Sequence, residues 1–205
     1  MKQLEEVLKE IQTTTKKISR VYLEIEPKEF KRQWILIFKA LTGHNYSIDE
    51  DNKEIINQMY FYLVGSSSFN GSLSKGLMMT GNYGTGKTKI MEVIQNIIKA
   101  NTNKRLAFLS CPSIVEELKK NEMFYFYQRP LIMDEIGRET QVVKDYGTDR
   151  QPIIEILTQR YRYNAWTFVT SNFTIETLGE LYGGYIADRF KEMFNVIELT
   201  GKSRR

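Results

Sequence analysis

The segment between residues 81 and 88 has the residue types and spacing of a loop that binds phosphate groups. Its glycines let backbone N–H groups approach a phosphate closely, a lysine can reach the β- and γ-phosphates, and a hydroxyl can bind Mg²⁺. A short apolar run precedes the loop and a helical pattern follows it. The pattern therefore predicts a bound nucleotide, in preference to a glycine-rich turn that matches by chance. The eight residues fit G-x-x-x-x-G-K-[ST] without a gap and are Gly81, Asn82, Tyr83, Gly84, Thr85, Gly86, Lys87 and Thr88.

An acid pair follows a second apolar run, at residues 130–133. A central strand that ends in Asp134 and Glu135 would deliver both carboxylates to the phosphate end of a sheet. Asp134 would then hold Mg²⁺ together with Thr88, and Glu135 would orient and deprotonate an attacking water. Two surface acids at the end of an ordinary strand are the alternative. The order of elements between the loop and the acids favours the catalytic interpretation.

A third group of polar residues, Thr170-Ser171-Asn172, ends the β-rich run that begins at Thr167. An asparagine at a strand end beside the acid pair could donate a hydrogen bond to the γ-phosphate or to the attacking water. Alternatively, Asn172 could cap a helix that is expected to begin near Thr174. The spacing alone leaves both interpretations open.

The elements that must position these residues alternate between strands and helices after residue 75. This alternation predicts a parallel sheet flanked by helices, with ligands at the carboxyl ends of the strands. The predicted strands cover residues 76–80, 105–110, 131–134, 167–171 and 196–199. The predicted helices cover residues 87–100, 113–120, 152–164, 174–181 and 186–194.

Residues 1–64 have helical spacing without strand patterning. A second helix is expected from Pro27 to just before Gly43, and a third from Ser47 or Asp49 to about Val64. We therefore predict two regions: 1–64, a helical linker or partner-binding region, and 65–205, the nucleotide-binding domain. The aromatic runs at 59–62 and 123–127 favour a core role, with base stacking as the alternative for the second. The first predicted helix rests on Leu4, Val7, Leu8, Ile11 and Ile18.

The composition excludes several classes of protein. One cysteine, Cys111, allows no intramolecular disulfide, and with a single histidine it makes a cysteine-based zinc site untenable. No apolar run has the length of a membrane span, and the first residues lack the apolar core of a signal peptide, so we expect a cytoplasmic protein with no membrane partner. The net charge of +4 permits contact with nucleic acid without arguing for it.

The motifs taken together resemble those of AAA+ ATPases, in particular the DnaC-type helicase loaders and the related IstB transposition ATPases. The resemblance covers residues 75–205, about two thirds of the chain, and the motifs occur in the family's order. The phosphate loop alone is unspecific, whereas the later motifs are much more specific. The matching stretches are KGLMMTGNYGTGKT at 75–88, LIMDEIG at 131–137, ILTQRY at 156–161, TSN at 170–172, IADRF at 186–190 and GKSRR at 201–205.

This resemblance implies roles that spacing could not assign. Asn172 falls on the sensor 1 position, Arg189 on the arginine finger that enters a neighbouring subunit's site, and Arg205 on a position resembling sensor 2. Read alone, Arg189 would instead be a solvated helix residue paired with Asp188 or Glu192. The resemblance also implies a P-loop AAA+ fold with a helical N-terminal extension, ATP and Mg²⁺ as cofactors, and a homo-oligomer. Its partners would be DNA, with single-stranded DNA expected, and either a replicative helicase or a transposase.

The expected function is therefore ATP binding and Mg²⁺-dependent ATP hydrolysis in the service of DNA. A DnaC-like helicase loader or replication factor is the first expectation, and an IstB-like transposition accessory ATPase is the alternative within the family. Outside the family, two alternatives remain: an adaptor that uses ATP as a switch with little turnover, and a P-loop kinase for a small metabolite. The kinase would not predict the Thr-Ser-Asn strand end or an arginine acting in a neighbouring subunit.

Overall fold

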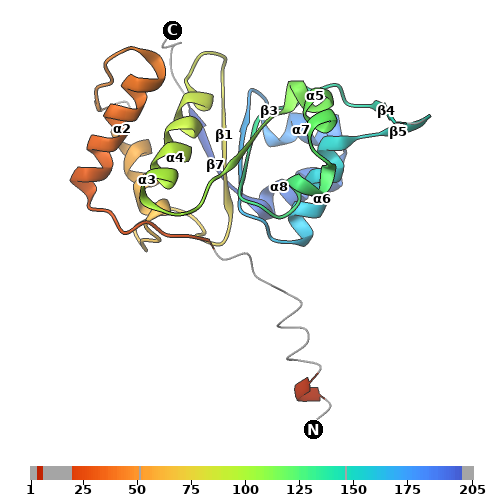
Figure 1. Cartoon of the computed structure of the whole chain (residues 1–205), viewed down its shortest axis with the longest axis horizontal. Helices are drawn as coiled ribbons and strands as arrows, with labels where there is room; N and C mark the ends of the chain where they lie inside the picture. The colour runs from red at the N-terminus through yellow and green to blue at the C-terminus, as the bar shows by residue number, and fades with distance from the viewer. Residues whose placement is uncertain (1–3, 7–19, 51, 146, 200–205) are drawn as a thin grey trace.

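The computed structural model describes residues 4–6, 20–50, 52–145 and 147–199 (Figure 1). Its centre is a sheet of five parallel strands in the order β2-β3-β6-β1-β7. This arrangement, with helices on both faces, confirms the predicted α/β fold and all five predicted strands. The strands are β1 (Gly76–Gly81), β2 (Ala107–Ser110), β3 (Leu131–Ile136), β6 (Thr167–Ser171) and β7 (Phe194–Leu199).

Two helical layers cover the sheet, one on each side (Figure 1). Successive residues of a strand point to opposite faces, so Leu77 and Met79 of β1 enter one core and Met78 enters the other. The first core lies under α2, α3 and α4, and the second under α6, α7 and α8. The helices are α2 (Pro27–Thr42), α3 (Lys53–Leu63), α4 (Lys87–Asn101), α5 (Ile114–Lys120), α6 (Pro152–Arg162), α7 (Ile175–Tyr182) and α8 (Gly184–Met193), with 3₁₀ turns η1 (Cys111–Ser113) and η2 (Met123–Phe126).

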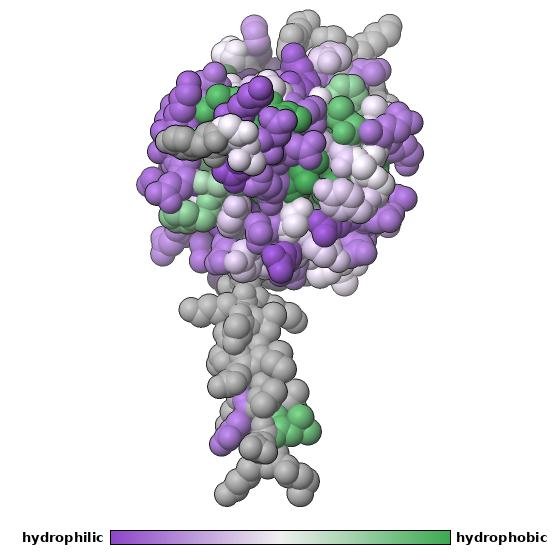
Figure 2. Space-filling view, turned by 90° about the vertical axis from the view of Figure 1, so that its right-hand side faces the viewer, coloured by the Kyte–Doolittle hydropathy of each residue, from purple (hydrophilic) through white to green (hydrophobic). Residues whose placement is uncertain are grey.

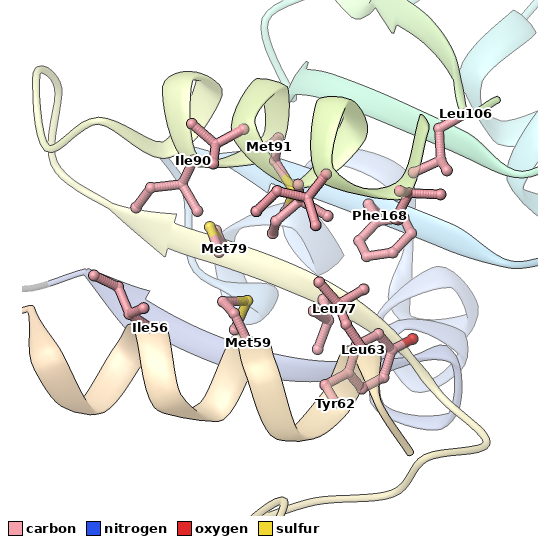
Figure 3. Close-up of a cluster of buried hydrophobic side chains, with 14 of the residues drawn as sticks. Ile56, Met59, Tyr62, Leu63, Leu77, Met79, Ile90, Met91, Leu106 and Phe168 are labelled. Atoms are coloured by element: carbon pink, nitrogen blue, oxygen red, sulfur yellow. The ribbon is translucent and has the colours of Figure 1, made fainter. Parts of the chain in front are cut away.

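Helices α2 and α3 pack into the same core as β1 and α4. Phe30 and Trp34 of α2 are fully buried, and Met59 of α3 lies under β1 (Figure 3). Tyr62 of α3 donates a hydrogen bond to the Lys75 carbonyl oxygen at 2.8 Å, immediately before β1 begins. These contacts join residues 27–63 to the nucleotide-binding sheet, while the division of the chain at residue 64 stays a prediction.

The ends of the N-terminal helices follow local signals. Helix α2 begins at Pro27 and stops at Gly43, whose φ of 73° suits glycine, as predicted. Helix α3 begins later than predicted because Asp49 and Asn52 bond to each other: each backbone N–H donates to the other's side-chain oxygen, at 3.1 and 3.2 Å. Of the first predicted helix, residues 4–6 are helical and the rest of its apolar positions lie outside the described residues.

Two further features differ from the sequence prediction. The helix predicted to end at Phe194 ends at Met193, because Phe194 is buried and starts β7 by pairing with Gly76. An antiparallel hairpin of β4 (Val143–Asp145) and β5 (Thr148–Arg150), which was not predicted, projects beside α6 (Figure 1). Its strands are too short and too polar to show an alternating pattern.

On the face that Figure 2 shows, hydrophilic residues predominate and the apolar patches are small and separate. In the predicted aromatic run at 123–127, Phe126 is buried whereas Phe124 is 66% exposed, so the run belongs only partly to the core. None of the described helices is long and apolar enough to cross a membrane.

Candidate active site

The phosphate loop lies between β1 and the amino end of α4, where a helix dipole favours an anion. Gly81, Gly84 and Gly86 have φ values of 135°, 79° and 92°, which L side chains rarely adopt. A Cβ atom on Gly81 would lie 2.4 Å from the Leu199 carbonyl oxygen of β7, so this glycine is also required by packing. At Gly86 a Cβ atom would meet nothing within 4 Å, which leaves the backbone open to a ligand.

Lys87 is held against the backbone of this loop. Its Nζ donates to the carbonyl oxygens of Gly81 and Asn82 at 2.7 and 2.8 Å. The side chain is almost completely buried, and burial lowers the pKa of the ammonium, while Glu135 and Asp134 act in the opposite direction. A cation between the loop carbonyls and two acids can transfer its hydrogen bonds to an incoming phosphate.

Asp134, Thr88 and Thr170 form a hydrogen-bonded cluster that links β3, α4 and β6. Thr88 Oγ1 donates to Asp134 Oδ1 at 2.9 Å and lies 3.2 Å from Oδ2. Thr170 Oγ1 donates to Asp134 Oδ1 at 2.6 Å. Burial raises the pKa of Asp134, and the bonds from Thr170 and Thr88 oppose that rise. The structure thus brings together the two residues that the sequence assigned to Mg²⁺.

Glu135 occupies a β-bulge. Its φ is 57°, and the pairing of β3 with β6 shifts register between Met133 and Ile136. A bulge changes the direction of the side chain that it carries and is common next to active sites. Consequently Glu135 does not continue the regular alternation of β3, and its backbone N–H instead donates to Thr170 Oγ1 at 2.9 Å.

The carboxylate of Glu135 pairs with Arg138, a residue that sequence reasoning did not single out. Arg138 Nη1 donates to both carboxylate oxygens at 2.8 Å, and the guanidinium lies 5.7 Å from the ring centroid of Tyr83 in the phosphate loop. Arg138 and Glu135 are three residues apart, and that spacing of opposite charges was the only sequence signal for the pair. The pair is partly exposed, which makes it weak and reversible.

Asn172 lies just beyond the carboxyl end of β6, and its side-chain amide has an unused donor. Its Nδ2 is buried and has no hydrogen-bond partner within the described part of the chain. The alternative role as a helix cap is filled by Thr174, whose side chain accepts a hydrogen bond from the Thr177 backbone N–H at 3.3 Å. A buried donor without a partner costs free energy, so native structures rarely keep one without a reason. Nδ2 is therefore a candidate hydrogen-bond donor to the γ-phosphate or the attacking water.

Arg189 is not brought to the acid pair. It lies on α8, where its Nη1 donates to Thr158 Oγ1 at 2.8 Å and its guanidinium lies 5.2 Å from the ring centroids of both Tyr161 and Tyr185. The alternative expectation, an ion pair of Arg189 with Asp188 or Glu192, is not what the structure shows. Glu192 accepts a hydrogen bond from the Tyr161 hydroxyl, and Asp188 Oδ1 lies 4.0 Å from Lys191 Nζ. Arg205 lies outside the described residues.

The donor set fits Mg²⁺ and a nucleoside triphosphate. Across the described residues, no group of three or more His, Cys, Asp or Glu side chains could hold a metal by itself. Mg²⁺ bound with a nucleotide needs only one or two protein oxygens, because phosphates and waters supply the other ligands. Thr88 and Asp134 would supply those oxygens, and the open backbone at Gly86 and the buried Asn172 Nδ2 would face the phosphates.

Solved structures of replication proteins have a similar fold. The crystal structure of the DnaC helicase loader matches with a TM-score of 0.58 at 20% identity over 83% of this chain and 99% of that chain. The crystal structure of DnaI matches with a TM-score of 0.59 at 24% identity over 92% and 99%. The replication initiator DnaA bound to AMPPCP and single-stranded DNA matches with a TM-score of 0.53 at 22% identity over 77% and 49%.

The strand order, the phosphate loop and these matches define the class: the chain has the α/β fold of a P-loop AAA+ protein. Within that class its fold is similar to that of the DnaC-like helicase loaders, as the sequence motifs predicted. At these identities the likeness is one of fold. No family model matches the chain, and no curated protein matches it significantly.

Proposed function

We propose that this protein is an AAA+ ATPase that binds and hydrolyses ATP with Mg²⁺ and acts in DNA replication as a helicase-loader-like factor. The observation that carries the enzymatic part is the Thr88–Asp134 contact, which joins the phosphate loop to the acid strand. Asn172 supports it independently: it follows β6, which pairs with the acid-bearing strand β3, and its buried Nδ2 has no partner among the described residues. ATP is the proposed nucleotide because the similar DnaA structure holds the ATP analogue AMPPCP.

The proposed residues divide the reaction among them. Lys87 and the loop amides bind the β- and γ-phosphates, and Thr88 and Asp134 hold Mg²⁺, which neutralises phosphate charge. Glu135 accepts a proton from the attacking water, whose oxygen bonds to the γ-phosphorus as the bond to the bridging oxygen breaks and ADP leaves. Asn172 donates a hydrogen bond to the γ-phosphate or the water.

Arg189 acts in a neighbouring subunit of a homo-oligomer in this proposal. Its half-buried guanidinium lies between Tyr161 of α6 and Tyr185 of α8 and donates to Thr158, which supports a side chain that is held in place without a hydrogen bond or ion pair to its own acid pair among the described residues. An arginine supplied in this way contributes about 10³–10⁵ in rate in related phosphoryl-transfer enzymes. Single-stranded DNA and a replicative helicase are the proposed partners, supported by the DnaA and DnaC structures that the fold matches.

A mixing experiment tests the enzymatic proposal. Glu135→Gln removes the base but keeps Arg189, whereas Arg189→Ala removes the arginine but keeps the base. We expect each variant alone to be nearly inactive and an equimolar mixture to recover a substantial fraction of the wild-type ATPase rate. Arg162→Ala, an exposed arginine on α6, is the matched control and should keep the wild-type rate.

Three results would contradict parts of the proposal. A wild-type rate per subunit that is independent of protein concentration and insensitive to Arg189→Ala would exclude action between subunits. A wild-type protein that binds ATP without turnover, with or without single-stranded DNA, would be an ATP-switched adaptor. If a purified replicative helicase from the same cell neither binds the protein nor changes its ATPase rate, the loader assignment is wrong and a transposase becomes the partner to test.

A further inference from the structure

We propose that Thr170 is a positioning residue that sets the geometry of both acids, Asp134 and Glu135, through one hydroxyl group. The inference rests on the proposed function, because it concerns the acids that the proposal assigns to Mg²⁺ and to the attacking water. Thr170 is the fourth residue of β6 and lies two residues before Asn172. The side chain is completely buried.

The hydroxyl of Thr170 acts as both a donor and an acceptor. It carries one proton, which it donates to Asp134 Oδ1 at 2.6 Å, and it accepts the backbone N–H of Glu135 at 2.9 Å. The side chain of one acid and the backbone of the next are therefore fixed relative to the same oxygen atom. Because the β3 residues that it contacts are consecutive, any movement of Thr170 would change the relative position of the two carboxylates.

The contact with Glu135 explains why the β-bulge is stable. In the regular ladder a β3 amide would bond to a carbonyl of β6, but the register shift between Met133 and Ile136 interrupts that ladder. A residue with φ of 57° persists only where its surroundings hold it. Thr170 supplies the hydrogen-bond acceptor that the interrupted ladder lacks. It thereby fixes the backbone at Glu135 and, with it, the direction in which the Glu135 side chain projects from β3.

The contact with Asp134 distinguishes the two carboxylate oxygens. Oδ1 accepts from Thr170 at 2.6 Å and from Thr88 at 2.9 Å, whereas Oδ2 has the longer Thr88 contact of 3.2 Å. Thr170 thereby orients the carboxylate and leaves Oδ2 as the less engaged oxygen. Outer hydrogen bonds of this kind orient metal ligands, and their loss costs about 10- to 100-fold in metal affinity or activity.

Thr167, on the same strand, provides a matched control. It is equally buried, but its hydroxyl donates to the Ala165 carbonyl oxygen at 2.7 Å and accepts from Arg160 Nε at 3.0 Å, away from the acids. Thr167→Val and Thr170→Val remove the same atom from the same element. A purely structural role for both hydroxyls would therefore give both variants the same phenotype.

The test compares Thr170→Val, Thr170→Ser and Thr167→Val with the wild-type full chain, at a temperature where all four are folded. We expect Thr170→Val to lower kcat by about 10- to 100-fold and to raise by a similar factor the Mg²⁺ concentration that half-saturates binding of a fluorescent ATP analogue. Its affinity for that analogue without Mg²⁺ should stay close to that of the wild type. Thr170→Ser, which keeps the hydroxyl, should recover most of both losses, and Thr167→Val should show neither.

The proposal is overturned if Thr170→Val keeps both kcat and the Mg²⁺ dependence, or if Thr167→Val loses them to the same extent. It is also overturned if Thr170→Ser is as impaired as Thr170→Val, since the hydroxyl would then be irrelevant. The failure of the proposed function has a different signature. A wild-type protein without ATPase activity would contradict that function, while the Mg²⁺ titration of analogue binding would still decide the role of Thr170.

Discussion

Strand β6 has a buried polar cluster at each end, and the two clusters differ in what they leave unpaired. At the amino end, Arg160 donates to carbonyl oxygens of Phe126, Arg129 and Trp166 and to the hydroxyl of Thr167. Burial lowers the pKa of this arginine to about 9, so it remains a cation at neutral pH. These bonds fasten η2, the segment between η2 and β3, and the start of β6 to α6.

At the carboxyl end the polar groups are not all matched within the protein. Two acids lie next to each other, the pKa of Asp134 is raised by burial, and Asn172 Nδ2 has no partner among the described residues. Buried polar groups that satisfy one another stabilise a fold, whereas excess charge and an unused donor are arranged for a ligand. The comparison teaches that burial of polar residues does not by itself locate a functional site. An unpaired donor does not do so alone either, because Trp34 Nε1 in the core is also without a partner among the described residues; at the carboxyl end of β6 the unpaired donor occurs together with two acids.

The largest expected effect is the loss of protein stability when the cluster at the amino end of β6 loses Arg160. Arg160→Met would leave several buried oxygens without a donor, and we expect it to lower the free energy of unfolding by about 3–5 kcal/mol. Urea denaturation of the nucleotide-free protein measures this loss. Arg162→Met, on the exposed side of the same helix, should change stability by less than about 0.5 kcal/mol. A loss below about 1 kcal/mol for Arg160→Met would mean that water replaces the arginine.

At the carboxyl end of β6 we expect a substitution to change stability little and the ATPase rate strongly. Asn172→Ala removes a donor that has no partner among the described residues, so the free energy of unfolding without nucleotide should change by less than about 1 kcal/mol. The ATPase rate should fall by about 100-fold, because a donor to the developing charge is lost. Asn172→Asp, which keeps the shape but replaces the amide by a carboxylate, should be at least as impaired. A strong loss of stability with normal turnover would give Asn172 a structural role.

The smallest effect concerns the salt bridge between Arg138 and Glu135. The two side chains are 42% and 32% exposed, so their interaction is weak. Arg138→Ala frees the carboxylate of Glu135, and we expect the ATPase rate to rise by about two- to fivefold, the factor that corresponds to a weak exposed pair. Steady-state ATPase kinetics measure the change, with Arg138→Lys as the charge-preserving control. A severalfold decrease would instead mean that the guanidinium takes part in the reaction.

The sequence predicted the sheet and the phosphate loop because both rest on local signals. An apolar strand, a glycine pattern and a following helix are written in consecutive residues, as in the segment from Gly76 to Thr88. The pairing of Thr88 with Asp134 followed from the rule that parallel strands deliver their carboxyl ends to one edge.

Other features depend on contacts between distant segments, and the sequence could not show them. The role of Thr170 depends on its register opposite the bulge at Glu135, and a threonine in a β-rich run has no signal of its own. Arg160 resembles any helical arginine until its carbonyl partners are known. The hairpin of β4 and β5 was missed because three-residue polar strands carry too little pattern.

The central claim, that the carboxyl end of β6 and the neighbouring acids form an ATP-hydrolysing site, is tested most directly by Glu135→Gln. Nucleotide affinity and ATPase rate are measured on the same preparation of this variant and of the wild type. We predict an ATP affinity within about threefold of the wild type, because the phosphate loop is unchanged, and a rate at least about 100-fold lower, because the general base is lost. A variant that no longer binds ATP, or one that hydrolyses it at the wild-type rate, would contradict the assignment of the acid pair.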